Sequence, residues 1–275
     1  MVSGRYRVRK GVNMSHRRPL IGGNWKMNGD LAGSVELTED LIAALASDDL
    51  LEHVDVTISP PFPYLQAVGH ALRHYAVDLG GQDCSAHQSG AFTGQTSPSM
   101  LSDLGVASVL VGHSERRHGL EESDDLIASK IRAAVDASLI PVLCVGEIGS
   151  ERDAGKAHDV IATQVEAGLK KLAPEDVGLV SIAYEPVWAI GTGVTATPDD
   201  AQSAHYMVRE LLSSLYDAEL AESIRIIYGG SVKGANAAEL FACPDVDGAL
   251  VGGASLNPED FALICQAARN AAVHS

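Results

Sequence analysis

Eight short apolar runs recur along the chain, and segments with the amphipathic pattern of helices separate them. Most runs are apolar almost throughout, which is typical of parallel strands buried on both faces. Alternating strand and helix signals without a long polar linker favour one closed (β/α)8 barrel, an α/β fold, over two domains. The runs cover residues 20–25, 54–59, 76–80, 108–112, 140–145, 180–184, 224–228 and 248–251.

Helix-start signals lie between these runs. Thr197 precedes a proline and two acidic residues, which predicts an N-cap and a first helical turn, and Asn257 begins the same pattern. Residues 121–135 and 158–172 have apolar positions three and four apart, as in a surface helix. A doubly wound sheet would need a G-x-G-x-x-G fingerprint after its first strand, but residues 24–26 read Asn-Trp-Lys.

The charge of the chain limits its partners. Its 275 residues include 20 Lys and Arg against 36 Asp and Glu, a net charge of −16. Nucleic-acid binding and docking on an anionic membrane both need clustered positive charge, so we expect neither. No apolar run reaches the roughly 18 residues of a membrane-spanning helix. The four cysteines form no C-x-x-C pair, which favours a reducing compartment, the cytoplasm, over a disulfide or zinc framework.

The first 18 residues contain six basic residues and no acid. No apolar stretch follows them, which argues against a secretory signal. Three interpretations are open: a disordered extension, an upstream start with Met14 as the working one, or a transit-like tail, and the first two are favoured. We expect residues 1–18 to be a basic, disordered N-terminal extension and the barrel to span residues 19–275. The basic residues are Arg5, Arg7, Arg9, Lys10, Arg17 and Arg18.

The active site of a (β/α)8 barrel lies where its strands end at the carboxyl side. Lys26, His113 and Glu185 follow the first, fourth and sixth runs, so the sequence predicts that they converge at the barrel mouth. Glycine-rich turns follow the seventh and eighth runs, where such barrels often bind phosphate. Backbone N–H groups can cradle a phosphate there, because glycine has no Cβ to block close approach. The expected phosphate ligands are Gly191, Ser231, Gly252 and Gly253.

These residue types suit proton transfer. Lys26 supplies a local positive charge for an anionic substrate. Burial can raise the pKa of a carboxyl such as Glu185 toward neutrality, which suits a general base. His113 and Asn24 can donate hydrogen bonds to an oxygen that gains negative charge. Each residue alone has an ordinary structural explanation, but their joint placement favours a site. Since no nucleophile–base pair or metal-ligand set is present in the sequence, proton transfer beside a carbonyl of a small phosphorylated molecule fits better than hydrolysis or redox chemistry.

Four strings make a resemblance to a known family specific. Residues 24–28 read Asn-Trp-Lys-Met-Asn, 111–117 Val-Gly-His-Ser-Glu-Arg-Arg, 183–193 Ala-Tyr-Glu-Pro-Val-Trp-Ala-Ile-Gly-Thr-Gly and 228–232 Tyr-Gly-Gly-Ser-Val. In order and spacing the chain resembles the triosephosphate isomerase family from about Pro19 to its end. The resemblance implies a cofactor-free isomerase that interconverts dihydroxyacetone phosphate and D-glyceraldehyde 3-phosphate through an enediolate, in glycolysis and gluconeogenesis.

The resemblance also implies a role for each residue at the mouth. Glu185 would move the proton between the two carbons. His113, held neutral, would polarise the carbonyl oxygen and shuttle protons between the enediolate oxygens. Lys26 would bind the substrate, held in place by an ion pair with Glu115. Asn24 would orient the substrate oxygen.

A lid and a dimer loop are implied as well. Residues 186–196 would form a mobile lid, with Ser114 as the partner of Glu185 while the site is open. Residues 82–96, including Thr93, resemble the family's protruding loop that inserts beside the active site of a second subunit, so a homodimer is expected. The lid residues are Pro186, Val187, Trp188, Ala189, Ile190, Thr192 and Gly193, and Tyr228 and Ser231 would hold the closed lid.

Two positions depart from the family pattern. Val194 stands where many members have Lys or Arg after the lid's Gly-Thr-Gly, which can alter lid kinetics. Gln95 stands where Glu is common in the dimer loop, which can weaken one ion pair.

Two other functions fit parts of the sequence. The near-complete lid string disfavours a same-fold isomerase of a four-carbon ketose phosphate, and the presence of Glu185 and His113 disfavours a non-catalytic barrel scaffold.

Overall fold

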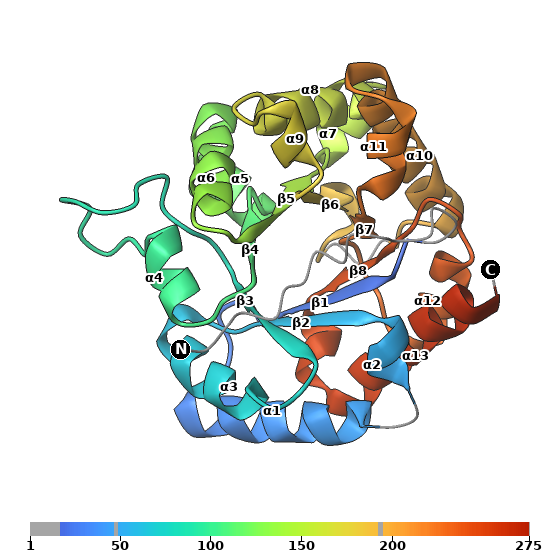
Figure 1. The fold of residues 1–275 in the computed structure, drawn as a ribbon. Helices are drawn as coiled ribbons and strands as arrows, with labels where there is room; N and C mark the ends of the chain where they lie inside the picture. Colours follow the sequence, from blue (N-terminus) through green and yellow to red (C-terminus); the bar gives the residue numbers. More distant parts are fainter. Residues whose placement is uncertain (1–16, 47–48, 192–194, 275) are drawn as a thin grey trace.

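The computed structural model describes residues 17–46, 49–191 and 195–274. Within them, eight parallel strands form a closed barrel in chain order, because β1 pairs with both β2 and β8 (Figure 1). The predicted (β/α)8 barrel is therefore confirmed. The strands are β1 (Leu20–Asn24), β2 (Asp55–Ser59), β3 (Val77–Gly81), β4 (Ser108–Val111), β5 (Ile140–Val145), β6 (Ser181–Tyr184), β7 (Ile226–Tyr228) and β8 (Gly248–Val251).

Helices surround the barrel, mostly between successive strands (Figure 1). They are α1 (Leu31–Leu45), α2 (Leu50–His53), α3 (Leu65–Leu72), α4 (Pro98–Asp103), α5 (Ser114–Gly119), α6 (Asp124–Asp136), α7 (Gly149–Asp153), α8 (Ala157–Leu169), α9 (Pro174–Val177), α10 (Pro198–Leu215), α11 (Ala218–Ser223), α12 (Gly234–Phe241) and α13 (Pro258–His274). Three 3-10 turns are η1 (Phe62–Tyr64), η2 (Val187–Ala189) and η3 (Gly253–Leu256).

Local signals explain where several elements begin. The Thr197 hydroxyl accepts from the N–H of Asp200, whose carboxylate accepts from the N–H of Thr197, so the predicted N-cap of α10 is a reciprocal capping box. Asn257 caps α13 by accepting from the N–H of Asp260. Four strands, β2, β3, β6 and β7, begin one or two residues later than the sequence predicted, and a helix C-cap explains two of these shifts. Val54 donates to Leu50 O as the C-cap of α2, and Ile224 is the C-cap of α11.

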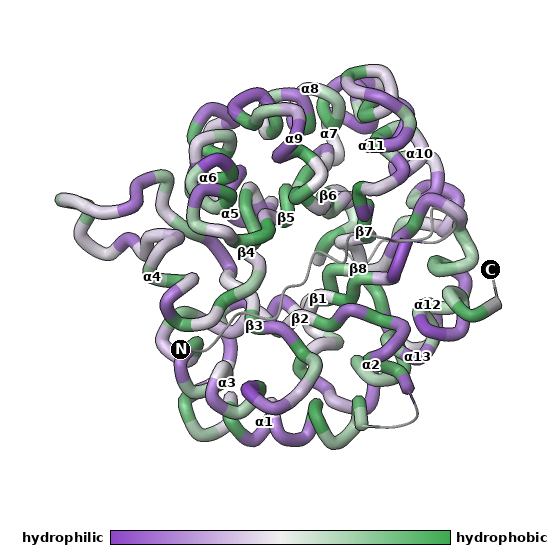
Figure 2. Tube along the Cα trace, viewed as in Figure 1, coloured by the Kyte–Doolittle hydropathy of each residue, from purple (hydrophilic) through white to green (hydrophobic). Residues whose placement is uncertain are grey.

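The hydrophobic core has two layers. One fills the barrel interior with side chains from six strands, and the larger one lies between the strands and the helices. In Figure 2 hydrophobic residues dominate central strands such as β5, whereas hydrophilic residues gather on the surrounding helices and loops. The inner layer consists of Leu20, Leu110, Val142, Cys144, Ala183, Ile227 and Leu250. This packing makes the barrel a rigid frame that leaves the strand ends to carry function.

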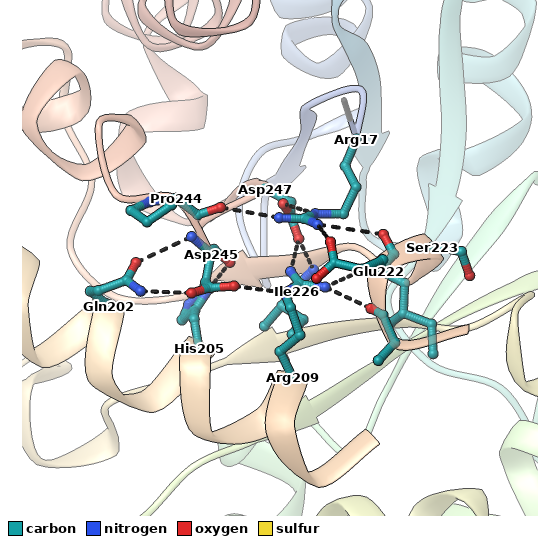
Figure 3. A network of polar contacts seen from close by, with 12 residues as sticks. Arg17, Gln202, His205, Arg209, Glu222, Ser223, Ile226, Pro244, Asp245 and Asp247 are labelled. Carbon is teal, nitrogen blue, oxygen red and sulfur yellow. Dashed lines mark hydrogen bonds and ion pairs between the residues drawn. The ribbon is translucent and has the colours of Figure 1, made fainter. Parts of the chain in front are cut away.

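A charge network joins α10 to the segments that precede β1 and β8 (Figure 3). The Arg209 guanidinium on α10 donates to Asp245 and Asp247 at 2.7 Å each. Arg17 donates to the other oxygen of Asp247 at 2.5 Å and pairs with Glu222. Next to it, Arg18 donates to Leu51 O at 2.7 Å and pairs with Asp55 at 2.8 Å. These contacts show that Arg17 and Arg18, which the sequence placed in the extension, pack against the barrel; residues 1–16 lie outside the described range.

The segment between β3 and α4 projects away from the barrel body (Figure 1). At its base the N–H of Ser85 donates to Thr96 O at 2.8 Å. At its tip His87 and Phe92 stack with ring centroids 3.9 Å apart. Residues 87–95 are all exposed. The segment is thus an ordered, closed loop with an unburied tip.

No helix within the described residues is long and apolar enough to cross a membrane. The described part of the chain also holds no group of three or more His, Cys, Asp or Glu side chains suited to a metal ion.

Candidate active site

Glu185 lies at the barrel mouth, directly after β6. The residue is only 2% exposed. Its backbone N–H donates to Val145 O at 2.7 Å, which continues the β5–β6 pairing by one residue. The proline at position 186 then ends the strand. The carboxylate is therefore fixed by the strand that carries it and is shielded from bulk water.

Two glycines make room for Glu185. A Cβ on Gly146, after β5, would lie 1.8 Å from the backbone oxygen of Glu185. A Cβ on Gly229, after β7, would lie 2.8 Å from its Cγ. Neither glycine has an unusual backbone conformation, so close approach alone requires them. They are functional residues that the sequence analysis did not assign.

His113 meets the carboxylate from β4. It is the N-cap of α5, and its Nδ1 accepts from the N–H of Glu115 at 3.2 Å. Since Nδ1 is an acceptor, the neutral ring carries its proton on Nε2. This Nε2 lies 2.9 Å from Oε1 of Glu185. The backbone N–H of Ser114 donates to Oε2 at 2.9 Å, so both carboxylate oxygens have a partner.

Lys26 approaches from β1. Its Nζ lies 2.6 Å from Oε1 of Glu115. Its backbone has φ +52°, a left-handed conformation that is strained for a residue with a long side chain. Two contacts stabilise this turn: the Lys26 N–H donates to Asn24 Oδ1 at 3.0 Å, and Gln82 donates to Lys26 O at 2.8 Å. Burial alone would raise the pKa of Glu115, but the Lys26 hydrogen bond, with a contribution from His113, lowers it below its usual value.

The glycine-rich turn after β8 lies beside Lys26. Gly252 follows β8, which pairs with β1, and a Cβ on Gly252 would lie 3.5 Å from Lys26 Cε. Gly253 begins η3 and is exposed, as is Ser231 after β7. Gly191 is exposed with φ +73°, a conformation that favours glycine. The turns after β7 and β8 thus supply accessible backbone groups, and the one after β8 lies near a cation, an arrangement suited to a phosphate.

The segment after Glu185 is held at its start. Trp188 in η2 donates from Nε1 to Glu147 Oε1 at 2.8 Å, and Tyr184 donates to the same oxygen at 3.2 Å. Burial raises the pKa of Glu147, although these hydrogen bonds oppose the shift. The Tyr228 hydroxyl is buried with no hydrogen-bond partner among the described residues. Pro186, Val187, Ala189 and Ile190 are described here, whereas the expected lid residues Thr192 and Gly193, with Val194, lie outside the described residues.

Glu147 is a further site residue that the sequence analysis left without a role. It follows β5 in the string Cys144-Val145-Gly146-Glu147, as Lys26, His113 and Glu185 follow their strands. This position, directly after a strand, was the feature by which the sequence could have identified Glu147. Thr93, by contrast, lies on the projecting loop, so a single chain does not bring it into this group.

Comparison with known proteins gives a consistent result. A family model described as Triosephosphate isomerase matches residues 19–268. The triosephosphate isomerase of Chromohalobacter salexigens is 51% identical over 253 residues, which are 92% of this chain and 100% of that protein. The Hahella chejuensis protein of the same name is 49% identical over 252 residues, 92% and 99% of the two chains. The one from Roseiflexus castenholzii is 49% identical over 245 residues, 89% and 95% of the two chains.

Proposed function

Because the chain belongs to the triosephosphate isomerase family, we propose that Glu185 and His113 perform the proton transfers of its reaction. The chain is an isomerase that interconverts dihydroxyacetone phosphate and D-glyceraldehyde 3-phosphate. The observation that supports the assignment most directly is the 2.9 Å contact between Nε2 of His113 and the buried Glu185 carboxylate.

Glu185 acts as the base. It removes a proton from the carbon next to the carbonyl and returns it to the neighbouring carbon, so an enediolate forms and collapses. Without substrate, His113 and the Ser114 N–H occupy the carboxylate. Substrate takes the place of His113 as the partner of the carboxylate, and the Nε2–H then becomes free to donate to the carbonyl oxygen. Donation there stabilises the oxygen as it gains negative charge.

Lys26 and the glycine-rich turns bind the anionic parts of the substrate. The ammonium group, oriented by Glu115, offsets the charge of the phosphate and of the enediolate. Asn24 orients the substrate oxygen. The backbone N–H groups of Gly191, Ser231, Gly252 and Gly253 hold the phosphate. A Cβ added to Gly252 would lie 3.5 Å from Lys26 Cε, and this closeness supports a shared anion position.

Residues 186–196 form a lid over this site. An enediolate phosphate can lose its phosphate group, so excluding water and fixing the phosphate protect the intermediate. The buried Tyr228 hydroxyl, which lacks a partner among the described residues, suits a group that accepts a bond from the closed lid. Ser231, three residues further along the chain, is the second residue that holds the closed lid.

The chain forms a homodimer through the loop of residues 82–96, and Thr93 reaches the partner's site. The loop is ordered but its tip is uncovered, and several large apolar side chains on this loop, on α4 and after β1 and β2 are exposed. Such surface is typical of an interface. These side chains are Met27 (94% exposed), Phe62, Phe92 and Met100. The buried thiols of Cys84, Cys144 and Cys265 suit the reducing cytoplasm.

The test is steady-state isomerisation of glyceraldehyde 3-phosphate beside a four-carbon ketose phosphate, with Glu185→Asp as the control variant. We expect kcat/KM for the triose of about 10⁷–10⁸ M⁻¹s⁻¹. Shortening the base by one methylene should lower it about 100-fold or more. Preference for the four-carbon substrate would contradict the substrate assignment, and turnover of neither would favour a scaffold. For the dimer, sedimentation of Thr93→Arg should show monomers with much reduced activity.

A further inference from the structure

The pairing between β4 and β5 ends just before the residues of the candidate active site. Val111, the last residue of β4, pairs with Leu143, whereas β5 continues to Val145. Gly112 then turns the chain out of the strand with φ +76°, a conformation that favours glycine. The ends of these two strands therefore need another connection at the level where the site begins.

The side chain of Arg117, on α5, supplies that connection. Its Nε donates to Gly112 O at 2.7 Å and, at a longer 3.2 Å, to Cys144 O on β5. Its Nη2 donates to the same Cys144 O at 3.0 Å. Its Nη1 donates to Asp124 Oδ1 at 2.7 Å, at the start of α6. One guanidinium thus joins the carbonyl that follows β4 to a carbonyl near the end of β5.

The chemistry of the guanidinium makes this connection rigid. The group is planar and its donors have a fixed fork geometry, so the carbonyls bound to it keep a fixed separation. The side chain of Arg117 is only 8% exposed, so water competes little for these hydrogen bonds. A Cβ on Gly112 would lie 3.1 Å from Nη2, so the guanidinium packs directly against the turn after β4.

The two carbonyls lie next to the residues that hold the proton-transfer pair. Gly112 directly precedes His113. Cys144 directly precedes Val145, whose backbone oxygen accepts from the N–H of Glu185 at 2.7 Å. The 2.9 Å contact between Nε2 of His113 and Oε1 of Glu185 therefore depends on the separation that the guanidinium sets between the two strand ends.

We propose that Arg117 is a positioning residue that sets the distance between His113 and Glu185 and thereby the rate of proton transfer. This role rests on the proposed function, in which these two residues exchange protons with the substrate. Arg117 acts through the backbone, because its hydrogen bonds go to two carbonyls and a carboxylate of the protein.

Loss of the guanidinium should affect catalysis more than binding. Proton transfer depends steeply on the position of the reacting groups. Lys26 and the turns after β7 and β8, which bind the anionic parts of the substrate, follow other strands. We therefore expect kcat to fall while KM changes little.

The test is Arg117→Met, which keeps the aliphatic stem and removes the guanidinium. Arg209→Met is the matched control, because Arg209 also donates to two backbone carbonyls, those of Ala221 and Ile224, and pairs with two aspartates (Figure 3). These partners precede β7 and β8 and do not lie at the mouth. We expect Arg117→Met to lower kcat about 10- to 100-fold, with KM within about threefold. Arg209→Met should lower the melting temperature and leave kcat of the folded enzyme unchanged.

A double-mutant cycle with Glu185→Asp separates positioning from general structural damage. In Glu185→Asp the carboxylate is already misplaced, so adding Arg117→Met should lower kcat by less than about threefold. Structural damage would lower kcat by the same factor in both backgrounds. Each kcat is calculated per site that binds phosphoglycolate, so that unfolded protein is not counted.

Arg117→Lys is the second variant and covers the case in which Arg117→Met does not fold. Lysine keeps the charge and can still donate to one carbonyl, but it lacks the planar fork. It should lower kcat about 3- to 10-fold, and by a smaller factor in the Glu185→Asp background.

The proposal is overturned if kcat of the folded Arg117 variants stays within about twofold of the unaltered enzyme, or if the loss is equally large in the Glu185→Asp background. Failure of the proposed function would look different, because Glu185→Asp alone would then turn over the triose no more slowly than the unaltered enzyme.

Discussion

Gly229 and Glu185 are packed so closely that a single methyl group on the glycine would contact the base: its Cβ would lie 2.8 Å from Glu185 Cγ. We expect Gly229→Ala to displace the carboxylate by several tenths of an ångström and to lower kcat/KM by about 10- to 100-fold. Steady-state kinetics and thermal unfolding measure the two effects separately. Gly119→Ala is the control, because its Cβ would meet nothing within 4 Å. Equal activity of the two variants would contradict the close-packing argument.

We expect the lysine of the Lys26–Glu115 ion pair to contribute more to kcat/KM than the glutamate. Lys26→Met removes the cation that faces the substrate and should lower kcat/KM by about 100- to 1000-fold. Glu115→Gln keeps a hydrogen-bond acceptor at 2.6 Å from Nζ and should lower it only about 3- to 10-fold. Steady-state kinetics of both variants, together with their affinities for inorganic phosphate, test whether the loss at Lys26 is larger than the loss at Glu115. A larger effect at Glu115 would mean that the carboxylate itself acts on the substrate.

His205 should make the folded state sensitive to acid. It is fully buried on α10; burial lowers its pKa to about 4, with a contribution from Arg209, although the bond to Asp245 O opposes the shift. Between the unfolded value of about 6.5 and pH 4 the unfolded chain binds a proton that the folded chain does not, so this histidine lowers stability as the pH falls.

The slope attributable to His205 should approach about 1.4 kcal/mol per pH unit in that window. Urea unfolding of the unaltered chain and of His205→Gln at pH 7.5, 5.5 and 4.5 gives the free energy of unfolding of each. The slope attributable to His205 is the change with pH in the difference between these two free energies. We expect the variant to be the less stable of the two at pH 7.5 and to lose less stability on acidification. Parallel pH profiles would mean that the pKa of His205 is the same in the folded and unfolded states.

Arg17 should contribute to stability and not to catalysis. Its guanidinium pairs with Asp247, which is buried, and with Glu222. Arg17→Met should lower the free energy of unfolding by about 1–2 kcal/mol and the melting temperature by about 3–6 °C, with kcat/KM unchanged. Arg269→Met, which loses a surface pair with Asp49, should cost less than about 1 kcal/mol. A loss of activity at constant melting temperature in Arg17→Met would contradict this.

The fold could be predicted because its signal is local. Most strands are nearly continuous apolar runs, and all eight lie within two residues of their predicted bounds. Glu185, His113 and Lys26 could be placed together because parallel strands bring their carboxyl ends to one side. Strand boundaries at Val54 and Ile224 were wrong because each residue instead ends a short helix.

The remaining site features depend on contacts between distant segments. Gly146 and Gly229 are needed only because β5 and β7 flank the strand that carries Glu185. Arg152 donates to Asp200 only because α7 meets the start of α10. Arg17 pairs with a residue 230 positions away. No local pattern encodes these neighbours, so the sequence alone could not assign them.

The pairing of β1 with β8 has a consequence for biosynthesis. Lys26 follows the first strand, and two of the glycines that we propose to bind phosphate, Gly252 and Gly253, follow the last strand; these residues meet only when the two strands close the barrel. A ribosome-bound chain that lacks its final segment therefore has every proton-transfer residue and still no complete binding site. Catalysis is thereby postponed until synthesis of the whole barrel is finished, and the onset of activity marks the end of chain assembly.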